Sequence, residues 1–567
     1  MRSPLKKMLP PLAALASAAL LRAALPPLSN SEVAFFAVVP LLLALRRAAP
    51  RQGFRLGGLF GLAYWLSSLS WLAALRNNGG PLPLVVFGLL ALSAWMSLFN
   101  AVFGWLSASL WTFSRRDGLP AAPFFRAAAW LCEPLLWAGA EYLASTLFTG
   151  FPWNPVAATQ TPNLALLSVT SLGGAQLLSA LVITSNSAVA SMLSGVWHDV
   201  VAPRFHATRP QPIPRPPSLK TGAGHFRCPR TLPLAFASIL LLAAWWRGID
   251  RVRALDHASL AAPQFRIALV HPDAACIFER DDDAVAAANK NLLSFTELAS
   301  ATSPDLVVWP ETSLPGYIPY DREAAALIRD ACQSSGAPLL AGGVEYAPRF
   351  PGDDNGLIFN SAILFDATPS IRASYRKRHL VPFGEYIPLE SRIPALKRLA
   401  PTGFSCEPGI DATLLAIEKR HSEKPRAAAT LAPLICFEDA FPYLARQSAL
   451  SGADAIVSIA NDAWFDGTSE PEQHLSQAIL RAVETGLPVI RSTNRGVTAF
   501  VLPSGRILRR IGDGFGAGTP GFITAEIGIT KNPARTTYAR FGDALFACPC
   551  AGLLLGLAAA LLLIRRK

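Results

Sequence analysis

The chain has 567 residues, which is too long for one ordinary domain. Apolar residues make up 51% of it and charged residues only 16%, with a mean hydropathy of +0.33, so its composition excludes an ordinary soluble protein. The net charge of +12 would suit nucleic acid, but Lys and Arg stand in short runs between apolar stretches, as membrane topology requires, so no nucleic-acid partner is expected. Eight cysteines without CxxC or His-rich spacing argue against a dense disulfide framework, a metal site or a cofactor.

Apolar runs separated by short polar breaks occupy the first 250 residues and recur near the C-terminus. Crossing a bilayer takes roughly 20 apolar residues, and the runs at 32–46 and 232–247 are short by that measure. The first run follows basic residues and resembles a signal peptide, but the spans behind it favour an uncleaved anchor. We predict eight spans, at about 9–26, 32–46, 56–75, 82–112, 127–147, 164–194, 232–247 and 543–564.

Basic residues fall in alternate breaks, which predicts an orientation through the positive-inside rule. In the intervening breaks at 27–31, 76–81 and 148–163, the only basic residue is Arg76. With eight spans, all basic breaks lie in the cytoplasm together with both termini. We therefore predict a membrane domain at 1–249, an external catalytic domain at 250–540, and a last helix with a basic tail at 541–567. The basic breaks contain Arg46, Arg47, Arg51, Arg55, Arg115, Arg116, Arg126, Arg204, Arg209, Arg215, Lys220, Arg227, Arg230, Arg565, Arg566 and Lys567.

Short β-rich apolar runs alternate with amphipathic stretches in the external segment. This alternation predicts an α/β layered domain, and about 280 residues suffice for one large core. The predicted strands are Phe265–Val270, Asp305–Trp309, Pro338–Val344, Ser361–Phe365, Thr430–Phe437, Ala455–Ile459, Pro488–Arg491 and Thr498–Leu502, and the predicted helices lie near 283–301, 322–335 and 472–486.

Three potentially reactive side chains stand at strand ends of this domain: Glu311, Lys377 and Cys436. Residues at the carboxyl ends of strands in an α/β domain share one edge, where sites usually form. A cysteine is nucleophilic as the thiolate, and a carboxylate nearby can take its proton. A lysine ammonium can stabilise the oxyanion that forms when a carbonyl is attacked.

Each of the three also has a structural interpretation. A cysteine at the end of an apolar strand is usually a buried small hydrophobe. Glu311, followed by Thr-Ser, fits a helix-entry turn. Lys377 stands in a basic cluster, which is typical of a solvated face or a membrane-surface contact. The three residues therefore indicate a catalytic site only when they are taken together.

The motifs around these residues resemble those of the nitrilase superfamily. They read Trp-Pro-Glu-Thr (309–312), Lys-Arg-His-Leu-Val-Pro-Phe-Gly-Glu-Tyr (377–386), Ile-Cys-Phe-Glu-Asp (435–439) and Asn-Asp-Ala-Trp-Phe (461–465). Together with eight spans they resemble one membrane-bound family, the apolipoprotein N-acyltransferases. Further motifs similar to that family lie at 148–153, 172–174, 473–474, 491–498 and 538–543.

The resemblance implies a nitrilase-like αββα sandwich on an eight-helix membrane domain. It implies Cys436 as nucleophile, Glu311 as general base and Lys377 as the oxyanion-stabilising residue. Glu385 and Glu438 would be supporting acids, although an ion pair with Lys377 or a neighbouring arginine explains them equally well. Supporting positions are also expected at Phe437 and Asn461, and substrate contacts at Arg76, Tyr142, Trp153, Phe278, Trp464 and His474, of which Arg76, Tyr142 and Trp153 serve equally well as interfacial anchors.

The resemblance also implies the reaction. Cys436 would take an acyl chain from a phosphatidylethanolamine-like phospholipid and pass it to the α-amino group of a lipoprotein's S-diacylglyceryl-cysteine, with ping-pong kinetics. The protein would act as a monomer in the bacterial inner membrane, with its catalytic domain in the periplasm. Two alternatives remain: a membrane-tethered amidase or esterase that passes the acyl group to water, and a non-catalytic scaffold or transporter.

Two features depart from the family pattern. The family carries a Trp near the start of the catalytic domain, where this chain has Phe278 as the nearest aromatic, which puts substrate-entry contacts in doubt. Phe437 follows the nucleophile where Tyr is also familiar.

Cys276, Cys332 and Cys406 would share the external compartment with Cys436, and a Cys276–Cys406 disulfide is conceivable there but not favoured.

Overall fold

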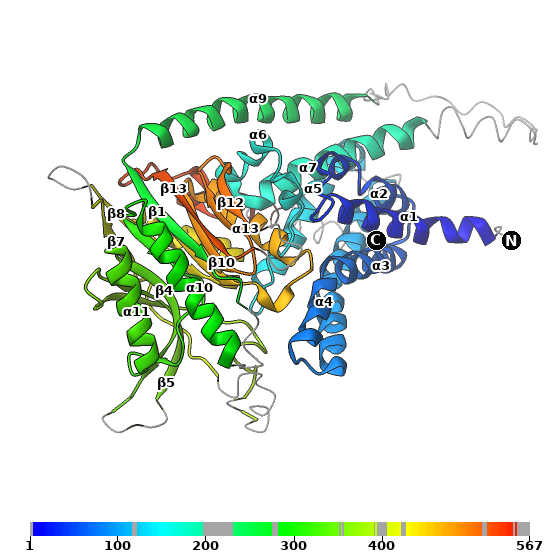
Figure 1. Ribbon diagram of the computed structural model, residues 1–567. Helices are drawn as coiled ribbons and strands as arrows, with labels where there is room; N and C mark the ends of the chain where they lie inside the picture. The colour runs from blue at the N-terminus through cyan, green and yellow to red at the C-terminus, as the bar shows by residue number, and fades with distance from the viewer. Residues whose placement is uncertain are drawn as a thin grey trace, which may run out of the picture.

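The computed structural model describes residues 4–115, 122–196, 231–274, 282–350, 353, 356–390, 392–393, 405–420, 427–512, 519–547, 550 and 552. A helical region and an α/β domain lie next to each other, and the long helix α9 (Leu232–Ala261) leads from the first to the second (Figure 1). It continues without a break to Ala261, and the first strand of the α/β domain begins at Gln264.

The helical region contains the apolar runs of the first 261 residues. Four helices among the described residues are long and apolar enough to cross a membrane: Pro50–Asn78, Leu82–Ser114, Thr170–Ser194 and Leu232–Ala261. The run at 32–46 forms a shorter apolar helix, and most of the run at 543–564 lies outside the described residues. Several of the predicted runs are thereby confirmed as long apolar helices that are candidate membrane spans, whereas the full set of eight stays a prediction. The elements are α1 (Pro4–Ala23), η1 (Ser31–Phe35), α2 (Val39–Leu45), α3 (Pro50–Ser68), η2 (Ser70–Asn78), α4 (Leu82–Ser114), α5 (Ala122–Thr146), η3 (Val156–Gln160), α6 (Leu164–Leu167), α7 (Thr170–Val196) and α9.

A break in α7 lies where this helix meets the α/β domain. Gly173 and Gly174 leave helical geometry, and Gly174 has φ +72°. A Cβ on Gly174 would lie 2.6 Å from the ring of Tyr538, so a side chain there would be strained and would also collide. The break leaves the backbone N–H of Ala175 available, and it donates to Glu484 at 3.0 Å.

Two sheets packed face to face form the α/β domain. The described strands run in the order β13-β1-β2-β4-β5-β6 in one sheet, with β3 beside β4, and β12-β11-β10-β9-β8-β7 in the other. Their facing sides share one apolar core. The first sheet contains β1 (Gln264–His271), β2 (Leu306–Val308), β3 (Tyr317–Ile318), β4 (Leu339–Ala347), β5 (Leu357–Phe365), β6 (Ile371–Arg376) and β13 (Gly521–Gly528). The second contains β7 (Leu415–Glu418), β8 (Ala428–Ile435), β9 (Ala455–Asn461), β10 (Val489–Asn494), β11 (Thr498–Val501) and β12 (Ile507–Ile511).

Helices cover the outer face of each sheet, which makes the αββα order of layers. On the first sheet these are α10 (Asp282–Ser300) and α11 (Arg322–Ser335), whose apolar faces form a separate core with it. On the second sheet they are α12 (Pro442–Leu450) and α13 (Glu470–Thr485). The short helix α14 (Thr537–Phe541) follows β13. The predicted α/β sandwich is thus confirmed.

The predicted strands and helices of this domain are present, and the differences lie where apolar alternation is weak. Strand β6 is half exposed, with arginines at two of its six positions, and was missed together with β3, β7, β12, β13, α12 and α14. The predicted strand Thr430–Phe437 was wrong at its end, because β8 stops at Ile435. Cys436 and Phe437 instead begin the 3-10 helix η6 (Cys436–Ala440).

Helix α13 joins the two regions. It is buried along its length, since one face packs on the second sheet and another on the helical region, and apolar residues of both regions form one continuous core. The side chain of Gln473 on this helix accepts hydrogen bonds at Oε1 from the helical region. The donors are Trp71 Nε1 at 3.2 Å, Trp153 Nε1 at 2.8 Å and Asn154 Nδ2 at 2.8 Å. The α/β domain is therefore docked on the apolar helices through both apolar and polar contacts.

Candidate active site

Cys436 stands in the turn between strand β8 and helix η6. Its φ is +51°, a left-handed conformation that non-glycine residues adopt rarely. A residue held in this way after a strand is presented at the sheet edge, as in the strand–turn–helix nucleophile elbows of other enzymes. The turn therefore holds the thiol at the carboxyl end of β8, where the predicted site should form.

Lys377 and Glu311 meet next to this turn. Glu311 follows β2, and Lys377 follows β6, which belongs to the same sheet. Lys377 is 1% exposed, and its Nζ lies 3.4 Å from Glu311 Oε1 and 2.9 Å from Glu385 Oε1. The structure thus brings Glu311, Lys377 and Glu385 together. Glu385 is the closer partner of the ammonium.

Asn360 was not predicted, yet it connects the two carboxylates. It lies in β5, and its Nδ2 donates to Glu311 Oε1 and to Glu385 Oε1, each at 2.7 Å. Its backbone carbonyl also accepts from the N–H of Lys377 at 2.8 Å. The only sequence signal was a polar residue inside an apolar strand, which does not identify its partners.

Electrostatics separate the roles of the lysine and the thiol. Burial opposes the charge of Lys377, but the carboxylates of Glu385 and Glu311 raise its pKa well above the usual value. Burial and then the charge of Glu311 raise the pKa of Cys436 well above its usual value, and Lys377 opposes this only in part. The site therefore favours the ammonium form of Lys377 and the neutral thiol of Cys436, which needs a base before it can attack.

Glu438 is fully buried and serves the backbone rather than an ion pair. Its Oε1 accepts from the backbone N–H of Arg378 at 2.7 Å and of His379 at 3.0 Å, and its Oε2 accepts from that of Ile435 at 2.9 Å. Tyr375 donates to the same carboxylate at 2.9 Å. Glu438 thus ties the segment after Lys377 to the Cys436 turn, while Glu385 is the acid that pairs with the lysine.

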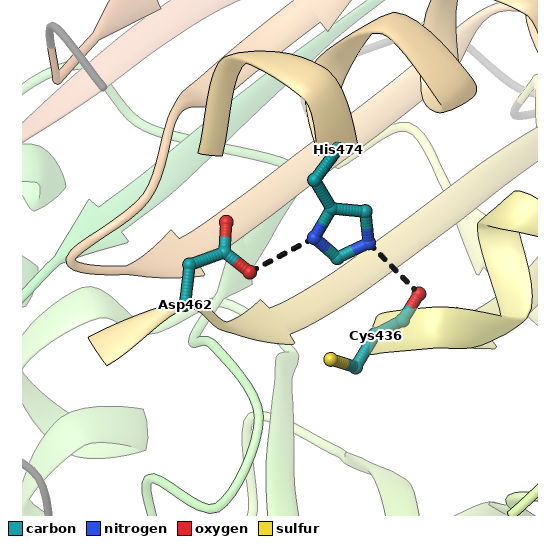
Figure 2. Close-up of side chains that lie close together, drawn as sticks. All are labelled: Cys436, Asp462 and His474. Atoms are coloured by element: carbon teal, nitrogen blue, oxygen red, sulfur yellow. Dashed lines mark hydrogen bonds and ion pairs between the residues drawn. The ribbon is translucent and has the colours of Figure 1, made fainter. Parts of the chain in front are cut away.

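A second charged cluster lies beside Cys436 (Figure 2). His474, on α13, is 2% exposed. Its Nδ1 lies 2.9 Å from Asp462 Oδ1, and its Nε2 lies 3.2 Å from the carbonyl oxygen of Cys436. The same Nε2 is 3.0 Å from Asp439 Oδ1. Arg491 pairs with the remaining oxygens of both aspartates.

This second cluster also contains the donor atoms of a possible metal site. The Cys436 thiol, an Asp462 oxygen and a His474 nitrogen lie within 4.8 Å of one another. Both ring nitrogens, however, already face carboxylates, and both carboxylates are paired with Arg491. The atoms therefore form a hydrogen-bonded charge network, and we assign it no metal.

Aromatic side chains from both regions form a wall beside the thiol. The ring centroid of Phe437 lies 5.9 Å from that of Phe151 and 6.2 Å from that of Trp153. Trp153 in turn packs on the His474 ring at 5.7 Å. A residue of the helical region therefore reaches the candidate site, as predicted for Trp153, although its indole N–H bonds to Gln473.

The remaining predicted positions differ in their exposure and contacts, and one of them lies outside the described chain. Arg76 is exposed near the end of η2, and Tyr142 is half-buried on α5. The carbonyl oxygen of Trp464 accepts from Asn78 at 2.8 Å. Asn461, at the end of β9, accepts from Asn494 at 3.0 Å. Phe278 lies outside the described residues.

The predicted cysteine pairing is tested only in part. Cys276 lies outside the described residues, whereas Cys332 and Cys406 are free thiols in the structure. Cys332 lies on the buried face of α11, in the core that this helix forms with the first sheet. The backbone N–H of Cys406 donates to the carbonyl oxygen of Glu385 at 2.7 Å, close to the site.

Comparison with known proteins places this chain in one family. Residues 17–188 match the Apolipoprotein N-acyltransferase N-terminal domain, and residues 262–529 match the Carbon-nitrogen hydrolase family. An apolipoprotein N-acyltransferase of Geobacter metallireducens is 29% identical over 549 residues, which cover 95% of this chain and 92% of that protein. One from Brucella suis is 33% identical over 485 residues, or 82% and 78% of the two chains. Among solved structures, Saccharomyces cerevisiae Nit3, of branch 10 of the nitrilase superfamily, matches with a TM-score of 0.34 and 20% identity over 47% of this chain and 90% of that one. The chain belongs to the apolipoprotein N-acyltransferase family.

Proposed function

We propose that this protein transfers a fatty acyl chain from a phospholipid to the α-amino group of a lipoprotein's S-diacylglyceryl-cysteine, through a thioester on Cys436. One observation carries the chemistry: a thiol on a left-handed turn shares a buried site with the Lys377–Glu311 pair. Apolar helices long enough to span a bilayer lie against the same domain, which suits substrates that reside in lipid.

In the first half-reaction Glu311 removes the thiol proton as sulfur attacks the ester carbonyl of the phospholipid. A base is required, because the resting thiol is protonated. The ammonium of Lys377 stabilises the oxyanion, and its two carboxylate partners keep it charged. The C–O bond then breaks, Glu311 returns the proton to the departing oxygen, and lysophospholipid leaves behind an S-acyl enzyme.

In the second half-reaction the α-amino group attacks the thioester. Glu311 accepts a proton from the amine, and Lys377 again stabilises the oxyanion. The C–S bond breaks, Glu311 returns the proton to the sulfur, and an amide is formed while the thiol is restored. Each half-reaction ends before the next substrate attacks, so ping-pong kinetics are expected.

The helical region allows both substrates to keep their acyl chains in lipid. Removing a chain from the bilayer would cost about 0.8 kcal/mol for each CH₂ group. The aromatic wall of Phe437 and Trp153 joins the thiol to the helical region, so only the reacting groups need to leave the lipid. We further propose eight spans, a phosphatidylethanolamine-like donor, and a catalytic domain on the periplasmic face of a bacterial inner membrane.

The proposal is tested with purified protein, a phospholipid with a labelled acyl chain, and a synthetic diacylglyceryl peptide. Wild type should accumulate a hydroxylamine-sensitive label without peptide and N-acylated peptide with it, as read by mass spectrometry. Cys436→Ala and Cys436→Ser, each folded and membrane-inserted, should do neither.

Two results would contradict the proposal. Equal turnover by wild type and Cys436→Ala would remove the thioester mechanism. Release of free fatty acid alone, with peptide present, would make the protein a hydrolase instead.

A further inference from the structure

The acyl-transfer steps above assign no role to His474, a buried residue of the second charged cluster. His474 touches the nucleophile only through the backbone carbonyl oxygen of Cys436, which its Nε2 meets at 3.2 Å. Figure 2 shows the ring bonded to this oxygen and not to Sγ, although Sγ and a ring nitrogen lie within 4.8 Å of each other. The hydrogen bond therefore acts on the backbone that carries the thiol.

The backbone of Cys436 needs such an anchor. Its left-handed conformation brings Cβ close to the following carbonyl oxygen, which disfavours it in any residue but glycine. Held conformations of this kind persist where the surroundings fix them. A hydrogen bond from a charged donor to the carbonyl oxygen of that residue is a strong restraint on the turn.

Geometry requires the ring to be the imidazolium. Asp462 Oδ1 faces Nδ1, while Asp439 Oδ1 and the Cys436 carbonyl oxygen face Nε2, and all three are acceptors. Both nitrogens must therefore donate. In agreement, Asp439 and Asp462 raise the pKa of His474 well above its usual value, against burial and against Arg491.

The charges around the ring come from every element that packs against it. Asp439 lies on η6, Asp462 follows β9, Glu470 is on α13 itself, and Arg491 is on β10. Burial and the neighbouring Asp462 raise the pKa of Glu470 well above its usual value, which disfavours its charged form. Two aspartates thus balance His474 and Arg491, and the imidazolium is neutralised within the cluster.

We propose that His474 is a positioning residue for the nucleophile: held by Asp462 and Asp439, it fixes the Cys436 carbonyl and thereby aims the thiol at the Glu311–Lys377 pair. The inference rests on the thioester chemistry proposed above. Trp153 packs on the His474 ring and is held by Gln473, the neighbour of His474 on α13. The helix that docks the domain on the membrane region therefore also sets the nucleophile.

A matched pair of variants isolates the hydrogen bond. Gln and Met have similar length, but only Gln can donate from the position of Nε2. Single-turnover acylation of His474→Met should fall about 100-fold, the effect of a small misplacement of a reacting group. His474→Gln should stay within about tenfold of wild type, and KM for the phospholipid should change little in either. His257→Met, at an exposed position on α9, serves as the control that keeps wild-type rates.

The outcomes separate this inference from the proposed function. If wild type forms no acyl-enzyme, the thioester mechanism fails before His474 is tested. If wild type is acylated and folded His474→Met matches it, or if folded His474→Gln is as slow as His474→Met, the positioning role is wrong.

Asp462→Asn tests the same role should His474→Met not fold. It leaves the ring in place and removes one carboxylate that keeps it charged. It also removes a negative charge near the thiol, which by itself favours the thiolate. Slower acylation would therefore support the positioning role, and acylation at or above the wild-type rate would overturn it.

Discussion

Two buried cations, Arg46 in the helical region and Lys377 in the α/β domain, are paired with glutamates in different ways. Arg46 holds both oxygens of Glu133, with Nε at 3.2 Å and NH2 at 2.5 Å. Ser187 and Ser191 accept its remaining donors, and its guanidinium lies 4.5 Å from the ring centre of Trp111. Lys377 instead divides its ammonium between two carboxylates beside a reactive thiol.

The difference indicates that the Arg46–Glu133 pair is structural and that Lys377 with its carboxylates belongs to the active site. A planar guanidinium with all three of its nitrogens engaged joins four helical elements, and no reacting group lies against it among the described residues. A compact ammonium beside Cys436 keeps its charge while an oxyanion forms. Charge within a membrane region usually suggests function, but here the contacts of Arg46 indicate structure.

The largest effect is expected when the base is removed from the reactive pair. Glu311→Gln should lower acyl transfer by about 10⁴-fold, at the upper end for a general base. Burial and Glu311 both raise the pKa of Cys436, so removing the carboxylate should lower it. Alkylation of Cys436 at fixed pH should therefore become faster while turnover is lost. Peptide mass spectrometry of iodoacetamide-treated protein measures this, and slower alkylation in the folded variant would contradict it.

Replacing the ammonium by a guanidinium tests the geometry of the site at constant charge. Lys377→Arg should lower acyl-enzyme formation by about 10²- to 10³-fold, as loss of one oxyanion donor does. The protein should remain folded, because a cation still faces Glu311 and Glu385. The labelled acyl-enzyme provides the measurement, and near-normal acylation would show that charge alone suffices.

Replacing the buried guanidinium of the helical region by an ammonium should change the stability of the protein rather than its activity. Arg46→Lys keeps the charge but loses the bidentate contact with Glu133 and several further hydrogen bonds. We expect a loss of about 2 kcal/mol in the free energy of unfolding, seen as a lower thermal midpoint in detergent. Acyl transfer per folded molecule should not change, and a selective loss of activity would make Arg46 part of the site.

The smallest effect is expected at the support of the Cys436 turn. Tyr375→Phe removes one donor to Glu438, which retains its three backbone N–H partners. The loss in the free energy of unfolding should be about 1 kcal/mol. The same energy in the activation barrier would reduce the rate of acyl transfer less than about tenfold. Chemical denaturation and initial rates measure the two quantities. A loss as large as that of Lys377→Arg would assign Tyr375 a direct role.

Several parts of the site could be predicted because they lie in short sequence motifs. Glu311 and Cys436 follow apolar runs, which form β2 of the first sheet and β8 of the second, and Glu385 follows Lys377 by eight residues. Asn360 and Arg491 could not be assigned in this way. Their partners are more than 20 residues away, and a polar residue in a strand gives no indication of which carboxylate it will meet.

Glu438 and His474 show why identifying a residue does not reveal its task. Both were named from motifs, Glu438 as an acid near the nucleophile and His474 as a substrate contact. In the structure Glu438 accepts from three backbone N–H groups, and His474 donates to the carbonyl oxygen of the nucleophile. These partners are backbone atoms, which carry no sequence signal.

The sequence by itself determined that the chain is a membrane protein with an α/β domain, because hydropathy and strand alternation are local properties. It also placed Glu311, Lys377 and Cys436 in one set, since their motifs are short and ordered. Only the tertiary structure decided the left-handed turn at Cys436, the carboxylates around Lys377 and His474, and the docking of α13 on the helical region. These depend on which distant groups are brought together and removed from water, and that is set by packing rather than by any one segment.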